Sequence, residues 1–351
     1  MMRRLLMASL VLVAIMPGTT AGVQAPDLDQ RLALFTRYLD PLRIQLGIPG
    51  LSAAIVSAGR IVWQDGFGYA DIDRRIPAAP DTPYRIASIT KTFSSTLLLQ
   101  CVARGTLDLD QPVRNVGATV PDPAATVRQV LAMASDQPAG SRYRYDGDRF
   151  ATLTPVIEAC TRSTLRQALR AEILDRVAMF NSVPGQDLET ATAGFDEPTL
   201  SRYRSVIARL AKPYTVTDGR PTVADYPPRG INAAAGLIST VRDLASYDAA
   251  IDSGVLLRRE TQTAAWTPFV LANAQRSPYG LGWFTQTTVA GPAVWHYGLW
   301  PTFSSLLLKL PSRNLTLILL ANSDGLNARF PLADGDVEVS PFARAFIAAV
   351  K

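Results

Sequence analysis

The stretch Ser88-Ile89-Thr90-Lys91 decides how the rest of this chain is interpreted. A hydroxyl and an amine three residues apart lie on one face of a helix, and Ser-x-x-Lys is a nucleophile signature. The same letters also fit a serine N-cap above a surface lysine. Of the four lysines in the chain, only Lys91 has a serine three positions before it. The spacing therefore predicts a nucleophile at Ser88 with Lys91 as its base.

Apolar residues follow this stretch at helical spacing. Leu97, Leu98 and Cys101 share one face, and Gly105 is suited to end the helix. The pattern predicts a helix from Ser88 to about Gly105. The nucleophile would then lie at a helix N-terminus, where positive potential helps to keep a neighbouring lysine neutral.

Strand patterns lie towards both ends of the chain and helical patterns lie between them. Residues 51–56 and 61–67 are rich in β-formers and are joined by a short turn, which predicts a hairpin. Four further strand patterns follow near the C-terminus, at 282–287, 293–296, 303–310 and 315–321. Helical patterns occur at 27–40, where Asp40-Pro41 restarts a further turn, and at 126–134, 150–160, 165–177, 240–251 and 342–350.

This order predicts an α+β fold. We expect an antiparallel sheet formed by the N- and C-terminal segments, flanked by helices, with an inserted all-helical lobe. One domain, 26–351, would consist of an α/β part (26–100 and 230–351) and a helical lobe (101–229). A cleft between the sheet and the lobe is the expected ligand site.

The first 25 residues have the pattern of a signal peptide. Arg3 and Arg4 precede an apolar run over 5–15, and small residues follow it. Cleavage after Ala21 or Ala25 would leave an exported protein, periplasmic or secreted, with no stable membrane span. An uncleaved anchor or a twin-arginine address remains an alternative.

Composition excludes several classes of function. The net charge of +5 is spread along the chain without a basic cluster, so no nucleic-acid partner is expected. A single histidine and two distant cysteines argue against a zinc site, and no phosphate-binding glycine loop is present, so no metal or cofactor is expected. Cys101 and Cys160 lie on apolar helical faces, which favours two buried thiols over a disulfide. The spacing does not decide between them.

Several motifs in fixed order carry a family resemblance. They are 48–52 (Ile-Pro-Gly-Leu-Ser), 84–93 around Ser88, 236–240 (Gly-Leu-Ile-Ser-Thr) and 279–283 (Tyr-Gly-Leu-Gly-Trp). With these motifs the chain resembles the serine β-lactamase and penicillin-binding-protein superfamily, in particular its class C and family VIII esterase-like members. The resemblance covers nearly all of 26–351 and implies the same fold.

The resemblance also implies two further site motifs. Tyr145-Asp146-Gly147 matches the second motif, Tyr-x-Asn, and Tyr145 is favoured over the nearby Tyr143. His296-Tyr297-Gly298 matches the third motif, Lys-Thr-Gly or His-x-Gly.

The roles of these residues follow from the resemblance and from the chemistry of acyl transfer. Tyr145 would pass a proton to the leaving group, and a protonated His296 would supply positive potential and an ionisation between about pH 5 and 8. A buried strand histidine is the alternative for His296. The backbone N–H groups of Ser88 and Leu299 would form the oxyanion hole, and Gly298 would let substrate lie against the strand.

Two departures from the family pattern bear on the substrate. Gly147 replaces the motif asparagine, and His296 and Tyr297 replace the usual Lys-Thr. We therefore expect an acyl-enzyme on Ser88 that hydrolyses esters or small amides. The alternatives are a β-lactamase, a D-amino-acid-specific peptidase acting on cell-wall fragments, or a non-catalytic penicillin-binding or sensor module.

Overall fold

A seven-stranded antiparallel sheet forms the centre of the molecule over the described residues, 27–188 and 194–351, of a computed structural model. The strand order is β3-β2-β1-β12-β11-β10-β9. These strands are β1 (Gly50–Ser57), β2 (Arg60–Asp71), β3 (Ile76–Pro77), β9 (Phe284–Thr288), β10 (Gly291–Trp300), β11 (Phe303–Leu310) and β12 (Leu315–Ala321). The predicted signal peptide lies outside the described residues.

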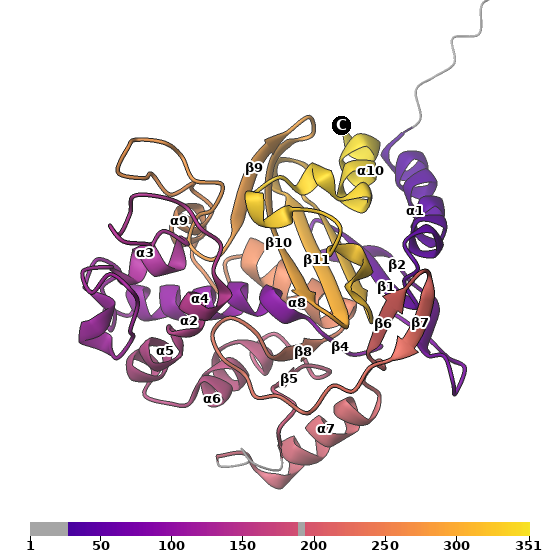
Figure 1. Cartoon of the computed structure of the whole chain (residues 1–351), viewed down its shortest axis with the longest axis horizontal. Coiled ribbons are helices and arrows are strands. Elements are labelled where there is room, and N and C mark those ends of the chain that lie inside the picture. Colours follow the sequence, from indigo (N-terminus) through magenta and orange to yellow (C-terminus); the bar gives the residue numbers. More distant parts are fainter. Residues whose placement is uncertain (1–26, 189–193) are drawn as a thin grey trace, which may run out of the picture.

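The N- and C-terminal segments meet in the middle of this sheet. β1 pairs with β2 along the predicted hairpin and with β12 on its other edge, so that Leu51 lies opposite Ala321. Every residue of β11 and β12 is buried, because helices cover both faces of the sheet (Figure 1). The predicted α+β class, with its antiparallel sheet built from distant segments, is confirmed.

Ten α-helices are found in the described residues. They are α1 (Leu28–Gln45), α2 (Thr90–Ala103), α3 (Val127–Leu131), α4 (Gly147–Ala151), α5 (Thr154–Thr161), α6 (Leu165–Leu169), α7 (Glu197–Ala208), α8 (Val241–Asp252), α9 (Arg259–Ala265) and α10 (Pro341–Val350). A π-turn follows α6 at Arg170–Leu174, and 3₁₀ turns occur at Ala87–Ile89, Val113–Val116, Pro311–Arg313, Asp324–Leu326, Leu332–Asp334 and Val337–Val339.

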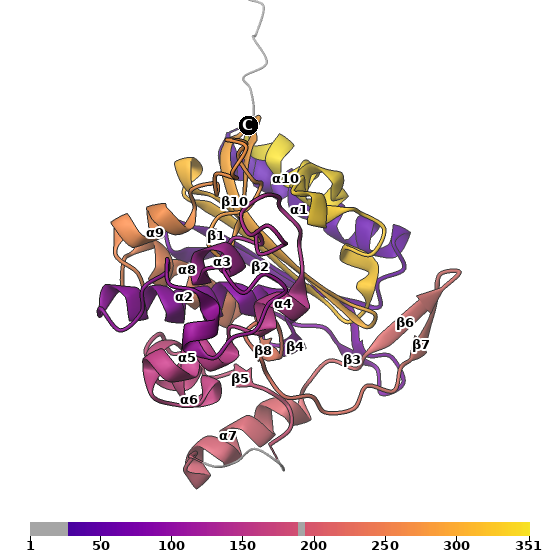
Figure 2. The same ribbon diagram turned by 60° about the vertical axis from the view of Figure 1, so that its left-hand side comes forward.

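Three helices, α1, α10 and α8, flank the sheet. α1 and α10 lie side by side (Figures 1 and 2), with the rings of Phe35 and Phe346 at 5.3 Å. α8 packs against β1 and β12. The expected restart at Asp40-Pro41 is absent, since α1 runs unbroken through Pro41 and keeps an apolar face on the core. No helix in the described part of the chain is long and apolar enough to span a bilayer.

The inserted region contains more than helices. β4 (Tyr84–Arg85), β8 (Leu237–Ser239) and β5 (Val183–Pro184) form a small sheet, and β6 (Tyr214–Thr217) pairs with β7 (Arg220–Val223) in a hairpin that projects from the body (Figure 2). The expectation that 101–229 is all-helical therefore needs correction for β5, β6 and β7. The main hydrophobic core runs through both the lobe and the sheet, and a second, small cluster lies around Val183, Tyr203 and Val206, so the domain boundaries remain a prediction.

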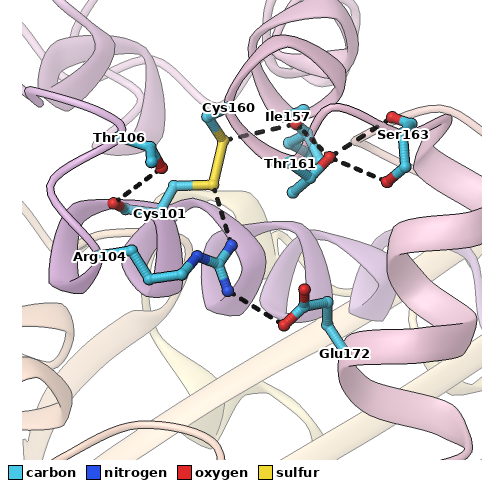
Figure 3. The surroundings of a disulfide bond; sticks show 8 residues. All are labelled: Cys101, Arg104, Thr106, Ile157, Cys160, Thr161, Ser163 and Glu172. Carbon is cyan, nitrogen blue, oxygen red and sulfur yellow. Dashed lines mark hydrogen bonds and ion pairs between the residues drawn. A yellow bond between two sulfur atoms is a disulfide. The ribbon is translucent and has the colours of Figure 1, made fainter.

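A disulfide joins Cys101 to Cys160, with Cα atoms 5.9 Å apart, and corrects the expectation of two buried thiols (Figure 3). Both cysteines do lie on helices, in α2 and α5, as the periodicity predicted. Sequence spacing could not show that these helices pack face to face. The bond ties the helix that follows Ser88 to the lobe.

Candidate active site

Ser88 lies in the 3₁₀ turn directly before α2. The preceding residue, Ala87, has φ of 46°, a left-handed conformation that non-glycine residues seldom adopt and that costs roughly 1–3 kcal/mol. The hydroxyl of Thr90 donates to the Ala87 carbonyl at 2.7 Å and supports the turn. The predicted position at a helix N-terminus is confirmed, with Ser88 itself two residues before the first residue of the α-helix.

Lys91 points back from the first turn of α2 to Ser88. Its Nζ lies 2.7 Å from the Ser88 Oγ and 3.1 Å from the carbonyl oxygen of Ala234. The side chain is 1% exposed. Burial lowers the pKa of Lys91 to about 7, and the charges of Asp146 and Asp148 offset part of that fall. Near neutral pH, much of Lys91 is therefore an uncharged amine that can accept the serine proton.

Tyr145 lies beside this pair, whereas Tyr143 does not. The Lys91 Nζ is 5.3 Å from the centre of the Tyr145 ring, and the buried Tyr145 hydroxyl has no well-formed hydrogen bond within the described residues. Burial raises its pKa well above 10, and its interaction with Ser88 only partly offsets the rise. The Tyr143 hydroxyl instead donates to the Ala333 carbonyl at 2.7 Å. Tyr145 therefore carries its proton at neutral pH and can donate it.

A buried carboxylate holds the loop that carries Tyr145. Asp136, 2% exposed, accepts a hydrogen bond from Arg142 at 2.6 Å and another from Arg149, and Arg144 lies 3.6 Å away. Arg149 and Arg142 hold the pKa of Asp136 below its usual range against the effect of burial. Since the arginines flank Tyr145 in sequence, Asp136 fixes the position of the phenol.

His296 is a buried, neutral strand residue, which contradicts the expected ionisation between pH 5 and 8. Its Nδ1 lies 2.7 Å from the Tyr297 carbonyl, to which it donates, and its Nε2 lies 2.9 Å from the Tyr279 hydroxyl, from which it accepts. Burial, with a smaller contribution from the charge of Lys91, lowers its pKa to about 3. Both ring nitrogens are thus used to orient neighbours, and His296 supplies no cation near neutral pH.

Gly298 lets the Ser88 turn pack against β10. A Cβ at this position would collide with the Ile86 carbonyl oxygen and the Ser305 Oγ. We expected substrate to occupy the space that the missing side chain of Gly298 leaves, but the backbone before Ser88 occupies that space. Gly298 therefore sets the distance between the nucleophile and the sheet.

Leu299 lies in a stretch of β10 with an open edge. β9 pairs with β10 only as far as Trp295, so within the described residues the strand beyond that point has a neighbour, β11, on one side only. Leu299 is opposite Ser304 in β11. An extended substrate can reach this open edge. The part of the Leu299 N–H in an oxyanion hole stays a prediction.

Three further residues contribute to the site without having been predicted as site residues. The Asn327 Nδ2 donates to the carbonyls of Gly298 at 2.8 Å and Ser305 at 2.9 Å, which ties β10 to β11 at the site. Tyr279 orients His296, and the Ala234 carbonyl accepts from Lys91. Tyr279 and Ala234 fall in or next to motifs quoted above, but Asn327 lies in a turn without any such signal.

The missing motif asparagine leaves space next to the base. A Cβ on Gly147 would lie 3.8 Å from the Lys91 Nζ, so the position does face the site. With no carboxamide there, the Ala234 carbonyl is the neutral acceptor that remains for the amine. In the described part of the chain, no group of three or more His, Cys, Asp or Glu side chains is placed to hold a metal ion.

The family model named Beta-lactamase matches residues 34–338. The chain belongs to the Beta-lactamase family. Structural neighbours agree on the fold. The octameric penicillin-binding protein homologue from Pyrococcus abyssi superposes with a TM-score of 0.71 at 20% identity, covering 90% of this chain and 77% of that one. The D-alanine carboxypeptidase AmpC from Burkholderia cenocepacia gives 0.70 at 16% identity, covering 91% and 100%.

A relative in this family is the mouse mitochondrial serine beta-lactamase-like protein LACTB, 33% identical over 106 residues. That match covers 30% of this chain and 19% of the mouse protein, so the chain spans about a fifth of its length. A match of this length relates only the two matched segments, and nothing follows from it about the rest of LACTB. The superfamily predicted from the motifs is confirmed.

Proposed function

We propose that this chain is an exported serine hydrolase that forms an acyl-enzyme on Ser88 and hydrolyses esters or small amides, without a cofactor. The observation that carries the proposal is the 2.7 Å contact between Ser88 and a buried Lys91 whose pKa lies near 7. A structural lysine would be paired with a carboxylate, as the buried Lys309 is with Asp248 and Asp252.

The proposed reaction has two half-reactions. In the first, neutral Lys91 takes the hydroxyl proton of Ser88 while the Ser88 Oγ attacks the substrate carbonyl. The backbone N–H groups of Ser88 and Leu299 stabilise the oxyanion that forms. The Tyr145 phenol gives its proton to the leaving group and is reprotonated from Lys91. Water then attacks the acyl-enzyme while its proton passes to Lys91, and Lys91 returns that proton to the Ser88 Oγ as the acid leaves, which restores the free enzyme.

Export is supported by two features. The N-terminal pattern of Arg3, Arg4 and an apolar run is that of a signal peptide. The Cys101–Cys160 disulfide is typical of an oxidising compartment. The proposed location is the periplasm or the exterior.

A second candidate is a D-amino-acid-specific peptidase or β-lactamase, which the match to a protein described as a D-alanine carboxypeptidase favours. The space at Gly147 weighs against it, because no side chain is there to bind the amide of a peptide or β-lactam. The third candidate, a non-catalytic sensor, is weakened by the intact Ser88–Lys91 contact.

One experiment separates these candidates. Mature protein, Ser88→Ala and the control Ser94→Ala are each given p-nitrophenyl butyrate, a chromogenic cephalosporin and a D-Ala-D-Ala peptide, with intact mass followed. Ser94 lies on the same helix and its buried hydroxyl has no partner within the described residues. We expect ester turnover to fall by about 10³-fold or more in Ser88→Ala only.

Two results would change the assignment. Ester turnover that survives in Ser88→Ala would show that the nucleophile is wrong. A stable drug adduct on the wild-type protein without turnover of any substrate would support the sensor.

A further inference from the structure

A small cavity next to Ser88 is rich in cationic and aromatic side chains. Its volume is about 40 Å³, enough for one carboxylate or a few waters. The lining residues that matter are Arg85, Ala87, Tyr226, Arg229, Trp300 and Phe303. Ala87 directly precedes the nucleophile, so a group bound here is close to the reacting centre.

The Arg85 guanidinium lies against two aromatic rings and an amide, and no carboxylate of the described residues is within ion-pair distance of it. Its Cζ lies 4.1 Å from the centre of the Tyr226 ring and 4.7 Å from that of Phe303. The Gln186 side-chain oxygen accepts from its Nε at 3.0 Å and from its Nη2. The Nη1 is buried and has no hydrogen-bond partner in the described residues. Burial lowers the pKa of Arg85 to about 10, which reflects a cation without a compensating anion.

Arg229 adds a second cation at the same cavity. Its side chain is exposed, and its Cζ lies 5.1 Å from the Trp300 ring centre and 5.6 Å from that of Tyr226. Over residues 27–188 and 194–351, neither Arg85 nor Arg229 has a carboxylate within ion-pair distance, whereas Arg149 and Arg166 each do. Two guanidinium groups thus lie against aromatic rings, and the Arg85 Nη1 is a hydrogen-bond donor without a partner in the described residues. Together they form a site for an anion.

The position of Tyr145 indicates which part of a substrate reaches this cavity. Tyr145 borders a different hollow, of about 470 Å³, together with residues 142–144 and 333–334. The two hollows have no lining residue in common. In the proposed reaction the leaving group takes its proton from Tyr145, so the leaving group faces the Tyr145 side of Ser88, and the cavity at Arg85 and Arg229 is left for the acyl group.

We propose that this cavity binds the terminal carboxylate of a short acyl chain through Arg85 and Arg229, so that the preferred substrates are half-esters or half-amides of dicarboxylic acids. This inference rests on the proposed hydrolase function for its turnover and on the arginine pair for its charge preference. Trp300 and Phe303 wall the cavity and limit the length of the chain.

The test compares two esters of equal chain length, mono-p-nitrophenyl glutarate and p-nitrophenyl valerate, in wild type, Arg85→Met, Arg229→Gln and the control Arg37→Gln. Arg37 is an exposed arginine on α1. Ser88→Ala supplies the background rate for each ester. We expect wild type to favour the glutarate ester in kcat/KM by about tenfold or more, and either cavity variant to reduce that ratio by about tenfold. The ratio in Arg37→Gln should equal that of wild type.

A second measurement tests the anion site without catalysis. Glutarate and pentanoate are titrated into Ser88→Ala with tryptophan fluorescence as the signal, and again into Ser88→Ala combined with Arg229→Gln. We expect saturable quenching by glutarate that weakens about tenfold in the double variant, and that weakens with added salt. Because Arg229 is exposed, this variant tests the site even if Arg85→Met does not fold.

The outcomes distinguish the two proposals. Glutarate binding that needs Arg229, without Ser88-dependent turnover of either ester, would keep the anion site and reject the hydrolase. Ser88-dependent turnover of both esters with a ratio near one in all four proteins would keep the hydrolase and overturn the anion site.

Discussion

Lys91 is the residue whose charge controls the candidate site. Its pKa of about 7 means that the neutral fraction rises as the pH increases through neutrality. Since only the neutral amine can accept the Ser88 proton, we expect kcat/KM for p-nitrophenyl butyrate to rise with pH and to level off above an apparent pKa near 7. A pH series between 5 and 9 measures this midpoint.

Two variants assign that midpoint to Lys91. Asp148 is exposed and its charge raises the pKa of Lys91, so Asp148→Asn should move the midpoint to lower pH. His296→Gln should leave the midpoint in place, because the pKa of His296 is about 3. If the midpoint disappears in His296→Gln, the titrating group is His296 and not Lys91.

At the scale of single residues, the sequence predicted identities better than roles. Ser88, Lys91 and Tyr145 are brought together as their motifs implied. The protonation state of His296 could not be predicted, because it depends on burial and on the distant Tyr279. Asn327, which holds Gly298 in place, could not be identified from any sequence pattern. Its two hydrogen bonds are to backbone carbonyls of β10 and β11, which any residue type can supply.

The contact between the Ser88 turn and β10 sets the geometry of the site at the scale of elements. Gly298→Ala places a methyl group against the Ile86 carbonyl and Ser305, so we expect a loss of about 2–3 kcal/mol in unfolding free energy. Gly105→Ala is the control: its φ is 72° and nothing lies within 4 Å, so only the backbone cost of about 1 kcal/mol applies. Urea denaturation measures the unfolding free energy of both variants. Equal losses would mean that the Ser88 turn shifts to accommodate the methyl group without further cost.

The Asp136 cluster fixes a second element, the loop with Tyr145. We expect Asp136→Asn to cost about 2 kcal/mol of stability, because it removes charged hydrogen bonds from a buried group. The acylation rate should also fall, by about tenfold, as the phenol loses its position. Asp110→Asn, which breaks an exposed pair with Arg128, serves as the control and should cost less than about 1 kcal/mol.

Element boundaries followed the strength of the local pattern. The strongly apolar β11 and β12 match their predicted ranges, 303–310 and 315–321, in full. α7 and the β6–β7 hairpin lie between residues 178 and 231 of the lobe, where no individual helix or strand was predicted, because polar and turn residues hide their periodicity. α7 is held instead by a cap at Asp196 and by Tyr203 and Val206, which belong to a separate small core.

At the scale of the whole molecule, the disulfide joins the nucleophile helix to the lobe across 59 residues of chain. Closing a loop of that length is expected to contribute about 4 kcal/mol through the unfolded state. We expect Cys101→Ala combined with Cys160→Ala to lower Tm markedly, and dithiothreitol to lower the Tm of wild type towards the same value. A reductant that has no effect on wild type would mean that the thiols are not paired in solution.

The strand order has a consequence for how the chain folds. β1 lies between β2 and β12, so a strand that is synthesised early can complete its pairing only after β12 is synthesised near the end of the chain. Until then its apolar edge is open to pairing with strands of other chains, and contacts this far apart in sequence form slowly. The middle of the sheet is thus completed last, and we expect newly made chains to be most prone to aggregation before β12 pairs with β1.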